Sequence, residues 1–270
     1  MKPQQINNEH IVMTSKFMSK QFFISIAALT LFSNSNVMAE EIEATLEWSK
    51  RVELSTPVSG LVQEVFAQPG KIVAKGEVLI QLDPRAFKAD LKYAQANLKN
   101  ASEQHMEAKR ELDRQADMYD RAMLSEHELQ VAKNSFTAAQ AKYHQAQSSL
   151  IKAKLNLEYS AVRAPFNAIA ISIKAVKGQV VASEVTPPVL AIVAEAHRML
   201  ARFYTATDKI NNFVENQGVK VNVSGSMYQG KIFKIALEPD GLKSDLYAVD
   251  VVFDSKDSVL RAGQKVTLDL

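Results

Sequence analysis

A run of 76 residues without glycine or proline, from Arg85 to Ser160, constrains the fold of this chain more than any other feature. The run is rich in Ala, Leu, Lys, Glu and Gln, which are strong helix formers. Apolar residues recur in it at alternating steps of four and three, from Phe87 to Ala122 and again from Leu129 to Leu157. This heptad pattern predicts two long helices that pack along one seam, as in a coiled coil.

The heptad phase breaks between Ala122 and Leu129, where the chain is expected to turn. Ser125 is a preferred N-cap residue, and Glu128 three residues later completes a capping box, so a second helix should begin there. The two helices then form an antiparallel hairpin with arms about 55 Å long. Facing residues are expected to have numbers that sum to 251, for example Ala101 and Leu150, because this register pairs a large residue with an alanine in nearly every layer.

The segments on either side of the helical run resemble each other at a constant offset of 108 positions. "TPVSGLV" (56–62) aligns with "APFNAIA" (164–170), and Gly70 aligns with Gly178. Alternating Val and Ile with Pro and Gly between them predict short strands and tight turns, with both glycines in turns that need a positive φ. Each half is too small to close a core, so the halves should pair into one β-sandwich. Its predicted core residues are Val65, Ile72, Leu79, Ile80, Val162, Ile169, Ile173 and Val181.

The predicted fold class is mixed α and β: a split sandwich with an inserted antiparallel α-helical coiled-coil hairpin, followed by a β-barrel domain. Alternation and Gly turns in the C-terminal part predict the short strands of the barrel. The expected boundaries are an N-terminal strand at 40–50, the sandwich at 51–84 and 158–194, the hairpin at 85–157 and the barrel at 195–270.

Residues 1–39 have the pattern of a cleaved secretory signal peptide. Lys16 and Lys20 precede the apolar run "FFISIAALTLF" (22–32), and "VMA" precedes Glu40. An uncleaved membrane anchor is the alternative, although eleven apolar residues are few for a bilayer. No other stretch is as apolar, so the mature chain is expected to lack a transmembrane helix.

Charge and cysteine content narrow the compartment and the partners. Without residues 1–39 the chain carries 29 basic and 29 acidic residues, so it has no basic field to attract nucleic acid. It has no cysteine, which excludes disulfides and a lipid anchor on a cysteine. A Gram-negative periplasm fits this composition.

The sequence contains no motif for catalysis, a cofactor or a metal. "HELQV" (127–131) begins like a zinc-binding helix, but Val131 stands where the second histidine is required. His105 and His144 lie at similar distances from the turn, and we expect one packed in the seam and one solvated rather than a metal site. Because a phosphate loop, a nucleophile motif and a carboxylate pair are also missing, the chain is not expected to be an enzyme.

In their order along the chain, these features resemble the periplasmic adaptors, or membrane fusion proteins (HlyD-like), of tripartite efflux pumps. "STPVSGLVQEVFAQPGKIVAKGEVLIQLD" (55–83) and "VRAPFNAIAISIKAVKGQVV" (162–181) match the family's lipoyl-like halves, and "LRAGQKVTLDL" (260–270) matches its barrel. The resemblance implies an inner-membrane efflux transporter and a TolC-like outer-membrane channel as partners, self-association into a ring, and a periplasmic location. It favours a pump of the RND (resistance–nodulation–division) type.

Three alternatives stay open beside this reading. One is a plain coiled-coil scaffold with no transport role, and a second is an adaptor for type I secretion or ABC-type export. The third is a lipoyl or biotinyl carrier domain, which needs a reactive lysine on the turn that joins its halves. That turn is replaced here by the hairpin, and Lys71 and Lys75 lie within the first half. Many family members of the RND type also have a membrane-proximal domain, which we expect to be minimal, missing or truncated away in a chain that stops at Leu270.

Four residues near the turn are the candidate docking residues for the outer-membrane channel. Arg114, Met118, Arg121 and Ser125 are spaced by 4, 3 and 4, so they share one helical face while the helix continues. The resemblance adds that adaptors of TolC-like channels carry an Arg, a Leu four residues on and a Ser seven further. Met118 stands in place of that Leu and is similar in volume but more flexible.

Overall fold

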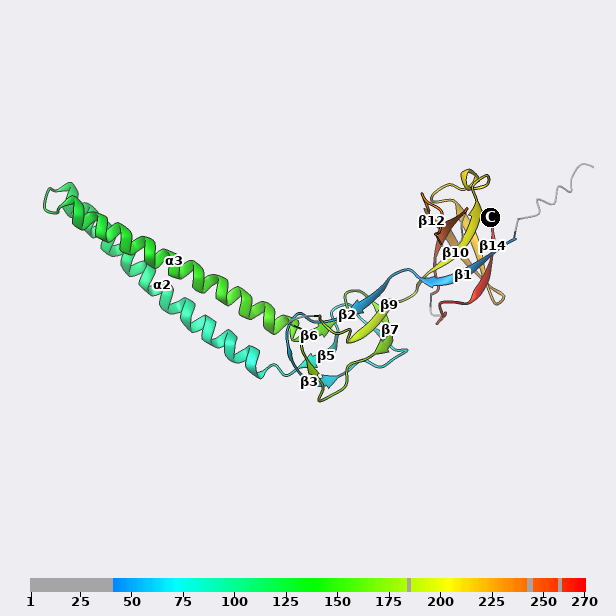
Figure 1. Cartoon of the computed structure of the whole chain (residues 1–270), viewed down its shortest axis with the longest axis horizontal. Coiled ribbons are helices and arrows are strands. Elements are labelled where there is room, and N and C mark those ends of the chain that lie inside the picture. The colour runs from blue at the N-terminus through cyan, green and yellow to red at the C-terminus, as the bar shows by residue number, and fades with distance from the viewer. Residues whose placement is uncertain (1–40, 184–185, 242–244, 257–258) are drawn as a thin grey trace, which may run out of the picture.

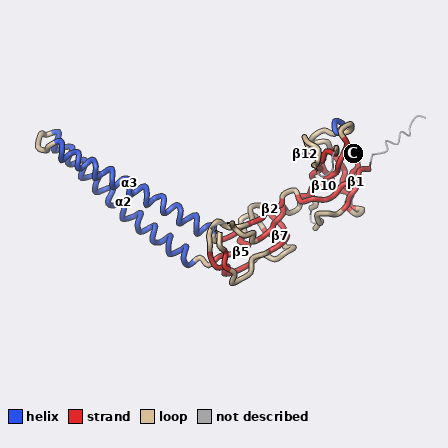
Figure 2. Tube along the Cα trace, viewed as in Figure 1, coloured by secondary structure: helices blue, strands red, loops and turns tan. Residues whose placement is uncertain are grey.

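The computed structural model describes residues 41–183, 186–241, 245–256 and 259–270. The predicted signal peptide lies outside the described residues. The molecule is elongated, with a helical hairpin at one end, a β-sandwich in the middle and a β-barrel at the other end (Figure 1). This arrangement confirms the predicted fold class, and Figure 2 separates the two long helices from the strand-built remainder.

The hairpin consists of α2 (Arg85–Asp120) and α3 (Glu126–Tyr159). The two helices run side by side and antiparallel (Figure 1). Their seam buries mainly small side chains, which lets the helix backbones approach closely. The buried seam residues are Ala94, Ala101, Leu129, Ala132, Ala146 and Ala153.

The predicted register of the hairpin is wrong by about one heptad. The His105 ring stacks on Phe136 at 5.2 Å and on Tyr143 at 5.4 Å between ring centroids. In the predicted register His105 faces Ala146, which would place Phe136 about 15 Å away along the helix. Facing residues therefore have numbers that sum to about 244 instead of 251. The alternation of large residues and alanines along the seam repeats every seven residues, so side-chain size cannot distinguish registers that differ by one heptad.

The turn explains the shift, because α2 ends at Asp120, earlier than the seam pattern indicates. Ala122 has a φ of 55°, in the left-handed region. The Ala122 amide donates to the Tyr119 carbonyl and the Met123 amide to the Met118 carbonyl, both at 2.9 Å. These bonds form the Schellman motif that commonly ends a helix. The turn is thus centred near Met123 rather than Ser125.

The start of the second helix confirms the predicted capping box. The Ser125 hydroxyl accepts a hydrogen bond from the Glu128 amide at 3.3 Å, and the Glu128 carboxylate accepts one from the Ser125 amide at 3.0 Å. Two amides at the helix start, which lack partners within the helix, are satisfied in this way.

A pair of cysteine variants tests the corrected register. Cysteines at Ala94 and Leu150 are expected to form a disulfide within one chain, because these positions face each other. Cysteines at Ala101 and Leu150 lie about 10 Å apart along the axis and should stay reduced. Mobility on a non-reducing gel distinguishes them, and a disulfide in the second pair alone would restore the original register.

The sandwich is built from eight short strands on both sides of the hairpin. Its sheets have the orders β2-β9-β7-β4 and β6-β5-β3-β8, and the hairpin connects the neighbouring antiparallel strands β5 and β6. The strands are β2 (Arg51–Leu54), β3 (Gly60–Val65), β4 (Ile72–Val73), β5 (Val78–Leu82), β6 (Ala161–Arg163), β7 (Ala168–Ile173), β8 (Val180–Val181) and β9 (Ala191–Glu195).

The two halves of the sandwich, which are related by the offset of 108 residues, each contribute a strand that pairs with a strand of the other half. Strands β3 and β7, and likewise β4 and β8, are related by that offset, and β3 pairs with β8 while β4 pairs with β7. The Gly70 amide donates to the Ala170 carbonyl at 2.7 Å, and the Gly178 amide donates to the Val62 carbonyl at 2.9 Å. Both glycines have positive φ, 80° and 86°, which confirms the predicted turns. Each half therefore completes a sheet of the other.

The predicted core of the sandwich is confirmed at most positions and wrong at two. Leu79, Ile80, Val162 and Val181 are buried in it, and Val65 and Ile173 pack against it. Ile72 is 51% exposed, and Ile169 is buried but faces the barrel domain. Strand β4 has only two residues, and Val73 occupies the core side. Because side chains alternate along a strand, Ile72 must point outward.

The barrel closes in the order β1-β10-β13-β12-β11-β14. Its strands are β1 (Glu41–Trp48), β10 (Arg198–Ala206), β11 (Gly218–Val223), β12 (Ser226–Ile235), β13 (Leu246–Asp254) and β14 (Lys265–Asp269), with the 3-10 helix η1 (Ile210–Asn212) after β10. The N-terminal strand, which the sequence analysis sets apart, closes the barrel: Glu41 pairs with Asp269 of β14, and Thr45 pairs with Arg202 of β10.

An ionic clamp joins three barrel strands on the outer surface. Arg202 of β10 donates to Asp250 of β13 at 2.6 and 3.0 Å, and it forms an ion pair with Glu47 of β1 at 2.8 Å. The hydrogen bonds to Asp250 hold the pKa of Arg202 above its usual range. The Asp250 side chain is almost fully buried, so this pair is less screened by water than the exposed pairs of the hairpin.

Candidate functional site

An open groove of about 610 Å³ lies between the helices beside the tip of the hairpin. Helix α2 forms one wall, α3 forms the other, and the turn contributes one residue. The lining residues are Ala108, Glu111, Gln115, Met118, Leu124, His127, Glu128, Val131, Ala132 and Ser135.

The floor of this tip groove is mainly apolar, apart from the half-buried Gln115, and its rim is polar. Met118 and Leu124 are half-buried, Ala132 is buried, and Val131 is 51% exposed. The rim carries the carboxylates of Glu111 and Glu128. Hydrogen bonds from the Ser125 hydroxyl and amide hold the pKa of Glu128 below its usual range. A floor of this kind suits an apolar side chain of a partner, while the rim offers polar contacts around it.

The structure separates the four predicted docking residues into two groups. Arg114 and Met118 lie one turn apart on α2, and Met118 lines the tip groove. Arg121 is the C-cap residue of α2, and Ser125 is the N-cap residue of α3. The expected single helical face is therefore wrong beyond Asp120, because the chain turns at Ala122.

Both arginines form exposed ion pairs within α2. Arg114 pairs with Glu111 on the groove rim, and Arg121 pairs with Asp117 at 2.8 Å. Their side chains are 63% and 67% exposed. Exposed pairs of this kind contribute about 0–1 kcal/mol to stability. The guanidinium groups can therefore exchange these partners for acceptors on another molecule at little cost.

Sequence reasoning missed Leu124 and Val131 as parts of the tip groove. It treated the tip as one stripe on one helix, whereas the groove is shared by both. The available signal was an apolar residue outside the seam of the second helix. Val131 has that property, since it lies outside the seam formed by Leu129 and Ala132.

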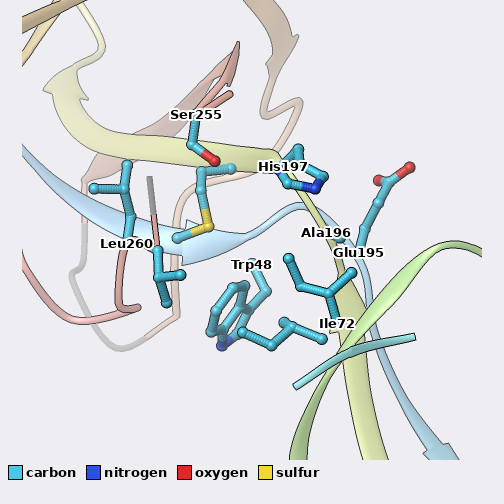
Figure 3. Close-up of a pocket in the computed structure, with 10 residues that line it drawn as sticks. Trp48, Ile72, Glu195, Ala196, His197, Ser255 and Leu260 are labelled. Atoms are coloured by element: carbon cyan, nitrogen blue, oxygen red, sulfur yellow. The ribbon is translucent and has the colours of Figure 1, made fainter. Parts of the chain in front are cut away.

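A second hollow lies where the sandwich meets the barrel (Figure 3). Trp48, Ile72, Ile169 and Met199 contribute apolar walls, and the accessible cavity is only about 30 Å³, which is room for about two water molecules. Glu195 lines it too, but it is engaged by the Ser49 hydroxyl at 2.8 Å and by Lys50 at 3.7 Å. We interpret this cavity as a packing seam between domains.

Within residues 41–183, 186–241, 245–256 and 259–270, no group of three His, Cys, Asp or Glu side chains is placed to hold a metal ion. In the same ranges, none of the helices combines the length and the apolarity that crossing a membrane requires.

Comparisons with known proteins give relatives among export and resistance proteins. The chain is 25% identical over 224 residues to the macrolide export protein MacA of Yersinia pestis, covering 78% of this chain and 60% of MacA. It is 26% identical over 142 residues to the multidrug resistance protein MexA of Pseudomonas aeruginosa, covering 53% of this chain and 33% of MexA. The chain thus spans between a third and three fifths of these relatives.

Solved structures share the same architecture. A MacA–MexA chimera with the MexA α-hairpin from Pseudomonas aeruginosa superposes with a TM-score of 0.66 at 25% identity, covering 84% of this chain and 79% of the chimera. The membrane fusion protein Spr0693 from Streptococcus pneumoniae R6 gives a TM-score of 0.64 at 14% identity, which shows the fold alone. The family model of the CzcB-like barrel-sandwich hybrid domain matches residues 50–195, more than half of the chain. The chain therefore belongs to the family of proteins with a CzcB-like barrel-sandwich hybrid domain.

Proposed function

We propose that this protein is the periplasmic adaptor that links an inner-membrane efflux transporter, of the RND type, to a TolC-like outer-membrane channel. The tip groove is the observation that carries the proposal, because it gives the far end of a long hairpin an apolar floor between exposed charged groups. Relatives named for macrolide export and multidrug resistance support the same role.

In this role the hairpin points at the outer membrane and its tip meets the channel. Arg114 donates hydrogen bonds to backbone carbonyls or carboxylates at the periplasmic mouth of the channel. Met118 and Val131 receive an apolar side chain in the tip groove, and Arg121 adds a second cation beside the turn. Ser125 caps α3 and presents the turn in a fixed conformation.

The sandwich and barrel of several copies stack laterally into a ring around the export conduit. The protein supplies no chemistry of its own, and the transporter supplies the energy. It resides in the periplasm after removal of the signal peptide and is held at the inner membrane through its partner pump.

Loss of the gene is expected to make the strain susceptible to one or more toxic compounds, and expression of the full chain should restore resistance. A photo-crosslinker attached at Met123→Cys, in the exposed turn, should capture an outer-membrane channel protein, whereas the same group at Lys88→Cys near the sandwich should not. Unchanged susceptibility of the deletion strain, together with no channel protein captured from the tip, would overturn the proposal.

A further inference from the structure

Positive and negative charges are divided between the two ends of the hairpin. Around the end that joins the sandwich, residues 83–99 and 145–163 contain seven Lys and Arg against three Asp and Glu, a net charge of +4. Residues 103–141, around the tip, contain five Lys and Arg against eight Asp and Glu, a net charge of −3. The chain from residue 40 onward is neutral as a whole, but its hairpin is polarised, and the positive end lies at the sandwich (Figure 1).

A groove of about 430 Å³ lies at this positive end, which we call the base groove. The first turns of α2, the last turns of α3 and strands β5 and β6 of the sandwich all contribute to its walls. Its Lys88 is about 45 Å from Met118 along α2, so the base groove is separate from the tip groove. The lining residues are Gln81, Pro84, Lys88, Leu91, Lys154, Leu157, Glu158, Ser160, Ala161 and Arg163.

Three exposed cations line the base groove without a carboxylate partner. Within the described ranges Lys88, Lys154 and Arg163 form no ion pair, although Glu158 lies one helical turn from Lys154 in the same groove. By contrast, four cations in the distal half of α2 each pair with a carboxylate of that helix. The first turn of α2 also has no acidic residue to offset Lys88. These three side chains are therefore available to an anion from outside the chain.

One of the three cations is held in place. The Arg163 guanidinium donates to the Gly76 carbonyl at 2.8 Å, which uses one of its five N–H groups and leaves the others for an acceptor. A side chain that is already oriented loses less freedom when it binds a ligand. The neutral polar groups have partners of their own: the Gln81 amide donates to the Ser160 carbonyl at 3.1 Å, and the Ser160 hydroxyl donates to the Leu157 carbonyl at 2.7 Å. The cations are thus the main donors that the base groove offers.

The rest of the lining is apolar. Leu91, Leu157 and Pro84 are half-buried, so part of their surface is open within the base groove. An inorganic anion would pair with the cations but leave this apolar surface in water, and a neutral hydrocarbon would cover the surface but leave the cations without a partner. A volume of about 430 Å³ lies in the range of small-molecule sites, which combine apolar walls with a few polar groups.

We propose that the base groove binds an amphiphilic organic anion of drug size, with its acid group held by Lys88, Lys154 and Arg163 and its apolar body against Leu91 and Leu157. The carboxylate of Glu158 in the same groove repels further acid groups, so a molecule with one acid group fits better than a polyanion. The bound molecule contacts α2, α3 and the sandwich at once and holds the hairpin against the sandwich. The inference goes beyond the adaptor role and does not depend on docking at the tip.

Two dyes that differ only in an acid group test the chemistry of the site. Anilinonaphthalene sulfonate and phenylnaphthylamine share one aromatic body, and both become fluorescent in apolar surroundings. Titrated into the purified exported chain, the sulfonate should bind at least about tenfold more tightly than the neutral dye, because hydrogen bonds to charged groups strengthen its binding. Inorganic sulfate at the same concentration should not displace it. Equal affinities for the two dyes would overturn the inference.

A pair of double variants locates the site. Lys88→Gln with Lys154→Gln should lower the affinity for the sulfonate dye about tenfold and leave that for the neutral dye unchanged. The matched control is Lys92→Gln with Lys152→Gln, which removes the same charge from the same two helices outside the base groove and should cost less than about twofold. All four lysines are exposed, so the helical circular dichroism should stay the same in both variants.

Two outcomes of this comparison would refute the base groove as the site. Equal losses in the two double variants would mean that the dye responds only to the overall charge of this end of the hairpin, and no loss in either would mean that it binds elsewhere. Either result would leave the adaptor role intact, because capture of the channel from the tip is measured separately.

Discussion

Replacing Arg114 by Asp is expected to abolish efflux while the protein stays folded, exported and bound to its inner-membrane partner. The substitution removes a donor beside the tip groove and adds a third carboxylate to the Glu111 and Glu128 already on its rim. Truncating a hot-spot residue of an interface costs about 2 kcal/mol or more, and a reversed charge adds repulsion. About 3 kcal/mol lowers the affinity for the channel by more than a hundredfold.

The fold should tolerate this change, because Arg114 is 63% exposed and its ion pair with Glu111 lies within one helix. Lys109→Asp is the matched control: Lys109 forms a similar exposed pair with Asp113 on the same helix, but Asp113 does not line the tip groove, whereas Glu111, the partner of Arg114, does. Drug susceptibility read beside periplasmic protein level decides the outcome. Wild-type resistance of Arg114→Asp at normal abundance, or an equal loss in Lys109→Asp, would remove the tip groove from channel docking.

The architecture is predictable from the periodic patterns of the sequence, because each pattern follows from the local geometry of a helix, strand or turn. The heptads of the helical run predicted the hairpin, and the repeat at an offset of 108 predicted the sandwich and the turns at Gly70 and Gly178. The capping box at Ser125 is equally local, since it needs only residues three apart. Short-range rules of this kind hold whatever the rest of the chain does.

Predictions were wrong where they required the exact number of residues in the turn between the helices, or the position of a neighbouring domain. The hairpin register requires the position where α2 ends, and Ala122 ends it in a left-handed conformation that alanine seldom adopts. Ile169 was assigned to the sandwich core by its alternation, but the structure turns it toward Trp48 at the barrel junction. Alternation of side chains identifies the two faces of a strand, but it does not show which domain packs against each face.

The tip groove was only half predictable for the same reason. Arg114 and Met118 follow from spacing on one helix, whereas Val131 joins them only after the hairpin closes in its true register. The N-terminal strand shows the same limit, because its place in the barrel depends on pairing with β14, more than 200 residues away in the sequence.

Truncation of Phe203 to Ala is expected to lower the free energy of unfolding of the barrel by about 3–5 kcal/mol. Phe203 is 1% exposed in the middle of β10, which pairs with β1 on one side and β13 on the other. Its ring also makes an edge contact with Phe213 at 5.3 Å. The cavity left behind is surrounded by a closed sheet that cannot collapse freely, so the loss should exceed the transfer term alone.

The measurement must isolate the barrel, because a chain with several domains does not unfold as one two-state unit. Trp48 is the only tryptophan of the chain and lies at the end of β1, so its fluorescence in urea follows the barrel together with its junction to the sandwich. Helical circular dichroism follows the hairpin independently. At about 1.5 kcal/mol per molar urea, a loss of about 4 kcal/mol lowers the fluorescence midpoint by about 2.7 M.

Phe233→Ala is the control, since Phe233 lies on β12 of the same barrel but is 56% exposed. Its midpoint should stay close to that of the unaltered chain, because exposed substitutions usually change stability by less than about 0.5 kcal/mol. The helical transition should be unchanged in both variants, as the hairpin shares no core with the barrel. A joint shift of both signals in Phe203→Ala would show that the domains unfold together, and an unshifted fluorescence midpoint would exclude Phe203 from the barrel core.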